Sequence, residues 1–254
     1  MKKVLYIFLF ALTLLIACGQ EKEEVTISVA ASLTDAMTDI IEQFEAENPN
    51  YTVAVNAGGS GALSQQIIQG APADIFFSAS LHDFKRVYQE GLIDDDYKIP
   101  LLANELVWIQ QADTELASEI DNFEQIAIGT PEAVPAGDYA KQALTGQGIY
   151  EALEGRFVFT KDVRQVMQYV EKGDVHAGLV YRTDALTSDK VQINEHLPIG
   201  THDAIIYPVG IINNKPAVEA FYQYLLTEEA ANIFEQYGFG KVDGDIDGSI
   251  FSTN

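Results

Sequence analysis

Apolar and polar positions along the chain follow two patterns, one typical of strands and one typical of helices. Residues 25–30 alternate β-branched and small residues, which is typical of a strand, whereas residues 36–46 carry apolar side chains at the spacing of one helix face. These patterns recur, and the expected elements are strands at 25–30, 51–55 and 74–77 and helices at 36–46, 62–69 and after Ser80. The order β-α-β-α-β-α predicts a mostly parallel sheet covered by helices.

A second cycle of the same kind begins near residue 105. Its expected strands are 105–110, 126–129, 157–159 and 177–181, and its expected helices are 139–144 and 163–171. The chain becomes strongly apolar again at 205–212, and two further helices follow at 216–226 and 228–237. We therefore expect two α/β lobes with mixed, mostly parallel sheets and a ligand cleft between them, the second lobe inserted into the first. Residues 25–102 and 205–240 form one lobe, residues 103–204 form the other, and the chain crosses near 101–104 and 203–206.

The first residues have the layout of an export signal. Lys2 and Lys3 precede an apolar run at 4–16, which is too short to span a bilayer as a mature helix. Cys18, the only cysteine, follows small residues in a sequence that resembles the lipobox of bacterial lipoproteins. We expect a signal peptide at 1–17, a lipidated Cys18 and a tether at 18–24, although a free thiol in an uncleaved leader is the alternative. This predicts a protein anchored on the extracytoplasmic face of the cell membrane.

The last residues are acidic. Residues 243–248 imitate the start of a calcium loop, but no helices flank them and no bidentate glutamate follows at the expected place. We therefore expect an unstructured acidic tail at 241–254.

Composition narrows the classes of partner. The formal net charge is -23, and 47% of the residues are hydrophobic, which is enough for substantial cores. Nucleic acid is a poor partner for such an acidic surface. If this protein binds an anion, it must do so with local dipoles rather than with its overall field.

Four expected helix starts share the chemistry that an anion needs. They are marked by Ser32, which has Asp35 three positions later as in a capping box, and by Ser60, Ala136 and Val163. The first backbone N–H groups of a helix have no partner inside it, and the helix dipole adds positive charge there. Two starts lie in each expected lobe, so lobe closure would bring four of them to one small cavity. The alternative for Ser32 is an ordinary cap on a solvent-facing turn.

Five separated motifs, collinear between about residues 25 and 240, carry a family resemblance. The segments 30–36, 70–76, 131–140, 162–164 and 178–181 together resemble the molybdate-binding proteins of bacterial ABC importers. The resemblance implies two α/β lobes of the type II solute-binding protein class that close on their ligand by a hinge motion. It also implies that the oxyanion is held, without cofactor or direct metal ligand, by Ser32, Ser60, Ala136, Val163 and Tyr181.

Three of these assignments have alternatives. Ser64 is the fallback for Ser60, because the loop here reads Gly-Gly-Ser-Gly where relatives often carry several serines. Tyr181 could instead be a strand-end tyrosine whose hydroxyl meets water. For Arg164, beside Val163, we expect either a structural ion pair or an ion pair between the lobes, rather than a direct contact with the anion.

Other function classes fit the sequence less well. Ser60 misses the Gly-x-Ser-x-Gly elbow of hydrolases by one residue, and the four histidines show no metal spacing. Ferric ion would need tyrosine, histidine or carboxylate ligands at the matched positions. We expect no enzyme but a monomeric lipoprotein that captures molybdate or tungstate and delivers it to the permease of an ABC importer. The same fold binding another anion, such as sulfate, is the alternative.

Overall fold

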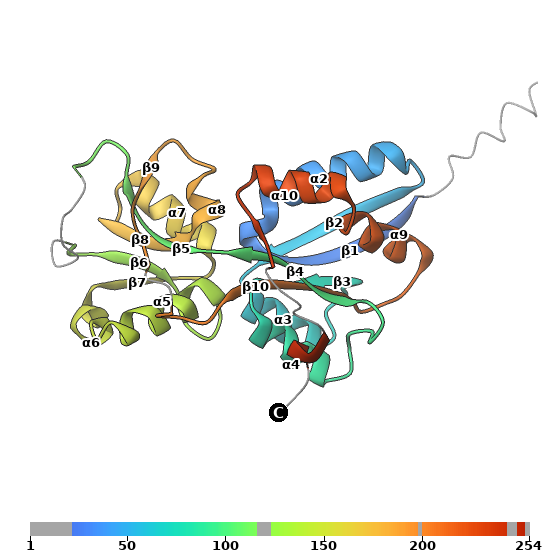
Figure 1. The fold of residues 1–254 in the computed structure, drawn as a ribbon, viewed down its shortest axis with the longest axis horizontal. Coiled ribbons are helices and arrows are strands. Elements are labelled where there is room, and N and C mark those ends of the chain that lie inside the picture. Colours follow the sequence, from blue (N-terminus) through green and yellow to red (C-terminus); the bar gives the residue numbers. More distant parts are fainter. Residues whose placement is uncertain (1–21, 116–122, 198–199, 243–247, 252–254) are drawn as a thin grey trace, which may run out of the picture.

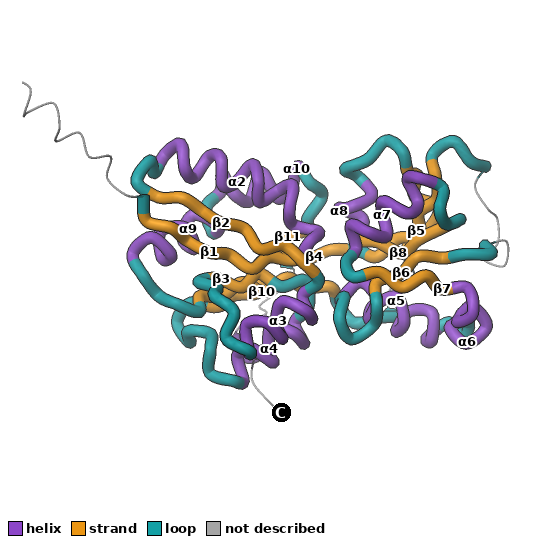
Figure 2. Tube along the Cα trace, turned by 180° about the vertical axis from the view of Figure 1, so that it is seen from behind, coloured by secondary structure: helices purple, strands orange, loops and turns teal. Residues whose placement is uncertain are grey.

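The computed structural model describes residues 22–115, 123–197, 200–242 and 248–251. The expected signal peptide and Cys18 lie outside these residues. Two bodies lie side by side along the long axis, each with one sheet between helices (Figures 1 and 2). We call the body that contains the first strand lobe 1 and the other lobe 2.

Lobe 1 is built on a sheet in the order β11-β4-β10-β3-β1-β2. Its strands are β1 (Glu23–Ala30), β2 (Tyr51–Gly58), β3 (Ile75–Phe77), β4 (Lys98–Asn104), β10 (Ile205–Ile211) and β11 (Gly240–Lys241). Its α-helices are α2 (Thr34–Glu47), α3 (Ser60–Ile68), α4 (Leu81–Gln89), α9 (Pro216–Leu225) and α10 (Glu228–Gln236). Figure 1 shows α2, α9 and α10 on one face and α3 and α4 on the other, so the central strands β3 and β10 and most of β1 are buried, whereas the edge strand β2 is partly exposed.

Lobe 2 repeats this plan with a sheet in the order β7-β6-β8-β5-β9. Its strands are β5 (Leu106–Gln111), β6 (Ile126–Gly129), β7 (Phe157–Thr160), β8 (Ala177–Tyr181) and β9 (Val191–His196). Its helices are α5 (Pro135–Gly146), α6 (Tyr150–Leu153), the 3-10 turn η4 (Glu154–Arg156), α7 (Val163–Lys172) and α8 (Arg182–Ala185). The predicted α/β class is confirmed for both lobes.

The sheets are mixed, as expected, but parallel pairs do not predominate in them. β1 pairs in parallel with β2 and β3, as the β-α-β order of elements predicted. In contrast, β10 is antiparallel to both β3 and β4. In lobe 2, β5 is antiparallel to β8 and β9. The cause is the crossing between the lobes: β4 and β5 are separated only by Glu105, so one nearly continuous segment enters both sheets.

Three local expectations differ from the structure. The first strand begins at Glu23, because Glu23 and Glu24 already pair with the start of β2, so the tether is shorter than expected. The C-terminal residues are also not wholly an unstructured tail. Residues Gly248–Phe251 form a 3-10 turn (η5), and the ring of Phe251 is buried 5.3 Å from that of Phe84. Finally, Ser32 does not cap a helix, as described below.

Candidate functional site

A small cavity lies between the lobes where the predicted residues meet. All five predicted ligand residues line it: Ser32, Ser60, Ala136, Val163 and Tyr181. The cavity leaves about 10 Å³ for the centre of a water-sized group, and none of the described residues that line it carries a charged side chain. Ser64, the fallback, does not line it. The structure therefore brings together residues that are up to 149 positions apart in the sequence, from Ser32 to Tyr181.

Ser32 reaches the cavity in a different way from the one predicted. It lies in a 3-10 turn, η2 (Ala31–Leu33), and α2 starts only at Thr34 with no side-chain cap. The hydroxyl of Ser32 is buried and lies 3.0 Å from the hydroxyl of Tyr207 in β10. The capping-box prediction is therefore wrong, because the chain makes one tight turn before the helix begins and the serine hydroxyl is held by another strand.

Ser60 is the first residue of α3 and is fully buried. Its Oγ accepts a hydrogen bond from the backbone N–H of Ala79 at 2.9 Å. One lone pair of this oxygen is thus engaged, while its proton is available for an acceptor in the cavity. Ser64 behaves differently, since its hydroxyl donates to the carbonyl of Gly61 at 2.9 Å.

Ala136 and Val163 bring backbone amides rather than side chains. Helix α5 begins at Pro135, which has no N–H, so Ala136 carries the first amide of that helix. Val163 is the first residue of α7, and the carboxylate of Asp162 caps this helix by accepting the N–H of Gln165 at 2.8 Å. Amides at these positions have no acceptor within the helix, so both helix starts offer donors to an anion.

The lobes touch closely beside the cavity. A Cβ atom placed on Gly61 in α3 would lie 2.8 Å from the carbonyl oxygens of Glu132 and Ala133 in lobe 2. Real side chains do not tolerate such a contact with backbone atoms, so only glycine permits this approach. The structure is therefore that of a closed pair of lobes.

The hydroxyl of Tyr181 is the least satisfied polar group of the site. Tyr181 ends β8 and is almost fully buried, and its hydroxyl has no hydrogen-bond partner among the described residues. Burial, together with the neighbouring Tyr207, raises the pKa of Tyr181 well above its ordinary value, so the group stays neutral and keeps its proton. A buried hydroxyl normally finds a partner. Here it faces a cavity in which a ligand could accept its hydrogen bond.

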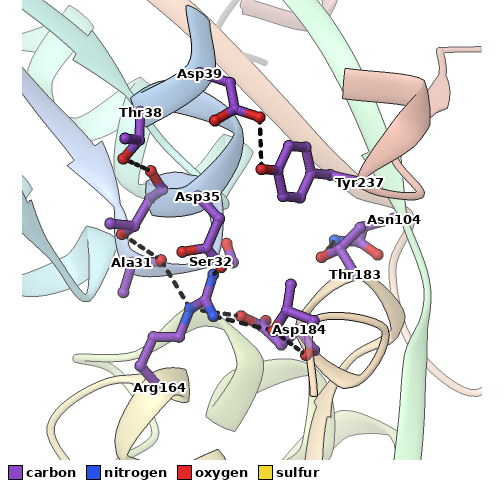
Figure 3. A network of polar contacts seen from close by, with 12 residues as sticks. Ala31, Ser32, Asp35, Thr38, Asp39, Asn104, Arg164, Thr183, Asp184 and Tyr237 are labelled. Carbon is purple, nitrogen blue, oxygen red and sulfur yellow. Dashed lines mark hydrogen bonds and ion pairs between the residues drawn. The ribbon is translucent and has the colours of Figure 1, made fainter. Parts of the chain in front are cut away.

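Arg164 joins the lobes beside the cavity and does not line it (Figure 3). Its guanidinium Nη2 lies 2.6 Å from Oδ2 of Asp35 in α2, and its Nε donates to the carbonyl of Ala31 at 3.3 Å. The predicted ion pair between the lobes is confirmed. Arg164 is thereby held by groups of lobe 1 while its own helix supplies the Val163 amide.

Asp184 lies on the other side of Arg164 and is fully buried. Arg164 Nε is 3.1 Å from its Oδ1, yet within the described part of the chain neither carboxylate oxygen receives a hydrogen bond. Burial raises the pKa of Asp184 to about 7, and the charge of Arg164 opposes this rise only in part. The ionised form of this carboxylate is therefore unfavourable in the folded protein.

Three residues near the site escaped the sequence analysis: Tyr207, Asn104 and Asp184. Tyr207 lies within an apolar run and Asn104 at the end of a strand that was not predicted, so neither stood out by pattern. Asp184 lies in the polar sequence Arg-Thr-Asp, which is typical of an exposed turn. It is buried because Arg164 of α7 packs against α8, the helix that contains Asp184.

Comparisons with known proteins place this geometry in context. Residues 25–240 match the family described as bacterial extracellular solute-binding protein. A protein of Bacillus subtilis (strain 168), named as a candidate substrate-binding lipoprotein of an ABC transporter, is 42% identical over 87% of this chain and 88% of its own. The molybdate-binding protein ModA of Escherichia coli (strain K12) is 36% identical over 86% of this chain and 90% of its own.

A solved structure shows the same fold. It is described as the substrate-binding domain of a candidate molybdenum ABC transporter from Clostridium difficile, with a TM-score of 0.68 and 38% identity over 87% of this chain and 100% of that chain. Within the part of the chain that the structure describes, no helix has the length and apolar character needed to cross a membrane.

Proposed function

The chain belongs to the bacterial extracellular solute-binding proteins, and we propose that it captures a tetrahedral oxyanion, molybdate or tungstate, for an ABC importer. Membership confirms the resemblance indicated by the five sequence motifs, and the relatives named above are solute-binding proteins of transporters. The choice of ligand and its delivery to a permease are our inference from the site.

The observation that carries the proposal is the unpartnered hydroxyl of Tyr181. It lies at the wall of the same cavity as the hydroxyl of Ser60 and the first amides of α5 and α7. Each of these groups can donate a hydrogen bond, and they approach from both lobes. A ligand that accepts on every side would satisfy them together.

The size and charge of the cavity favour a small anion. Pockets for drug-sized organic ligands hold on the order of 300–1,000 Å³, whereas this cavity leaves about 10 Å³ for the centre of a water-sized group. That is room for about one water molecule, so a large organic ligand is excluded, and the walls must move apart slightly to admit a tetrahedral oxyanion. The nearby cation, Arg164, is already paired with Asp35, so the anion would be held by dipoles and hydroxyls alone. This arrangement suits a chain with a net charge of -23, in which a net field cannot attract an anion.

A cavity made of donors also predicts selectivity. Molybdate, tungstate and sulfate carry no proton at neutral pH and accept at every oxygen, whereas monohydrogen phosphate carries a proton that needs an acceptor. Phosphate would therefore leave a buried donor unpaired, at a cost of about 1–3 kcal/mol. Sulfate has the same hydrogen-bonding character and is smaller, so the fit to the cavity must separate it from molybdate.

Capture would couple to lobe closure. Ser32 and Ser60 belong to lobe 1, whereas Ala136, Val163 and Tyr181 belong to lobe 2. A ligand that bonds both sets stabilises the closed state over the open one, which is a population shift. We propose that the closed monomer, anchored through Cys18 outside the membrane, presents the anion to the permease, and that it has neither nucleic-acid partner nor enzymatic activity.

Calorimetric titration tests this proposal. A chain that begins at residue 19 keeps every residue that the structure describes. We expect one-to-one binding of molybdate and tungstate, weaker binding of sulfate and little response to phosphate. Tight binding of sulfate in preference to molybdate, or no heat from any of the four anions, would refute the ligand assignment.

A further inference from the structure

A buried chain of hydrogen bonds connects the cavity with the crossing between the lobes. It starts at the hydroxyl of Ser32, which lies 3.0 Å from the hydroxyl of Tyr207. The side-chain amide of Asn104, the last residue of β4, donates to the same Tyr207 oxygen at 3.0 Å and to Oγ1 of Thr183 in lobe 2 at 2.9 Å. Figure 3 labels Asn104 and Thr183, which lie together in this view.

The orientation of the Asn104 side-chain amide is fixed by the hydrogen bond that its oxygen accepts. The backbone N–H of Glu105 donates to Asn104 Oδ1 at 2.9 Å, and only the carbonyl oxygen of the amide can accept it. The amino group must therefore face Tyr207 and Thr183, and both of its protons are used there. As a result, the oxygen of Tyr207 is an acceptor toward Asn104.

The proton of Tyr207 then has one described acceptor, Ser32 Oγ. Tyr207 is fully buried, and burial raises its pKa well above the ordinary value, so the hydroxyl keeps its proton. If Ser32 donated instead, the Tyr207 proton would be buried without a partner, which is unfavourable. Tyr207 is therefore the donor of this pair and Ser32 Oγ the acceptor.

We propose that Tyr207, oriented by Asn104, directs the hydroxyl proton of Ser32 into the cavity and so makes the site selective for oxyanions that carry no proton. This inference rests on the proposed oxyanion-binding function and assigns Tyr207 as a positioning residue that acts through Ser32. Tyr207 occupies a lone pair of Ser32 Oγ, just as the Ala79 amide occupies one of Ser60 Oγ. Both serine hydroxyls thus face the ligand as donors.

Removing the tyrosine hydroxyl should relax this selectivity. In Tyr207→Phe, Ser32 Oγ can rotate and accept a proton from monohydrogen phosphate. We therefore measure binding of molybdate, sulfate and phosphate by competition calorimetry at about pH 8, where all three are mainly dianions. The preference for molybdate over phosphate should fall about two- to tenfold, the effect of one hydrogen bond, while the preference for molybdate over sulfate stays unchanged because neither carries a proton.

A double-mutant cycle separates positioning from a merely structural role. In a Ser32→Ala background, Tyr207→Phe should leave the molybdate-to-phosphate ratio unchanged, because the residue through which Tyr207 acts is gone. Tyr222→Phe is the matched control, since Tyr222 is a buried tyrosine of lobe 1 that does not line the cavity. It should leave all three affinities unaltered.

Asn104→Asp provides an independent variant if Tyr207→Phe does not fold. A carboxylate can only accept, so Tyr207 would donate to it and Ser32 would donate to Tyr207, leaving lone pairs of Ser32 toward the cavity. The added charge weakens all dianions alike, but the molybdate-to-phosphate ratio should fall again. An unchanged molybdate-to-phosphate ratio in either folded variant, or an equal fall of this ratio in the Ser32→Ala background, would overturn the role of Tyr207 and leave the proposed function standing. Absence of molybdate binding by the unaltered chain would overturn the proposed function and this inference with it.

Discussion

Asp184 gives the sharpest prediction of stability, because its carboxylate is fully buried and, apart from the ion pair with Arg164, has no hydrogen-bond partner among the residues that the structure describes. Its pKa is raised from the ordinary value of 3.8 to about 7, with burial as the main cause. At about 1.36 kcal/mol per pKa unit, this difference corresponds to about 4 kcal/mol of unfavourable free energy for the ionised form. Such a cost is a large share of the stability of an ordinary domain.

The sign follows from proton binding in the two states. Between about pH 4 and pH 7 the folded chain keeps the proton on Asp184 while the unfolded chain has lost it, so the free energy of unfolding falls as pH rises through this window. Below pH 4 the carboxyl is protonated in both states and makes no difference. Above pH 7 the whole penalty is present.

The perturbation is Asp184→Asn, which keeps the shape and removes the titration. We expect the stability of this variant relative to the unaltered chain to rise by about 3 kcal/mol between pH 4.5 and pH 8, because part of the full penalty is already present at pH 4.5. Urea unfolding followed by the fluorescence of Trp108 measures it, because this single tryptophan is buried in lobe 2, where Asp184 also lies.

Asp189→Asn is the matched control, since Asp189 is exposed and removal of its charge changes the net charge equally. It should run parallel to the unaltered chain. Curves for Asp184→Asn that also run parallel, or a gap that widens toward low pH, would refute the account of this carboxylate.

Three predictions concern ligand binding and are measured by calorimetric titration with molybdate. Tyr181→Phe should weaken binding by about 1.5–3 kcal/mol, the value of a hydrogen bond to a charged group, yet leave the stability of the free protein equal or higher, because its hydroxyl has no partner there; a loss of stability without a loss of affinity would contradict this. Gly61→Ala should cost about 1–3 kcal/mol of affinity, because its Cβ would meet Ala133 in the closed state, and X-ray scattering should show compaction only at correspondingly higher ligand concentration; compaction at the same concentration as in the unaltered chain would argue against closure through this contact. Asp35→Asn should weaken binding by at most about 1 kcal/mol, since its ion pair with Arg164 is partly exposed. High salt should weaken molybdate binding more in the unaltered chain than in the variant, and an equal loss of affinity in both would contradict a contribution of this ion pair to closure.

The sequence predicted the elements whose residues show a clear period. The strand at Val25 and the helices after Ser60 and at Val163 were found because alternation, helical spacing and turn residues agree locally. Motif resemblance then placed Ser32, Ser60, Ala136, Val163 and Tyr181 at one site, and the structure brings them to one cavity.

What the sequence did not predict depends on contacts between distant segments. Tyr207 reads as one more apolar strand residue, and its role follows only from the approach of Ser32 and Asn104. The burial of Asp184 depends on Arg164 in another helix, and Phe251 is buried because Phe84 lies beneath it in spite of its acidic surroundings in the sequence. Local patterns contain no information about such pairings.

We propose above that the cavity between the lobes holds the oxyanion. Its most direct test is a crystal structure of the chain from residue 19 grown with tungstate, with data collected at the tungsten absorption edge. We expect one dominant anomalous peak in the cavity, with ligand oxygens within about 3 Å of the hydroxyls of Ser32, Ser60 and Tyr181 and of the amides of Ala136 and Val163. A dominant peak elsewhere, or an empty cavity in a protein that binds tungstate in solution, would contradict it.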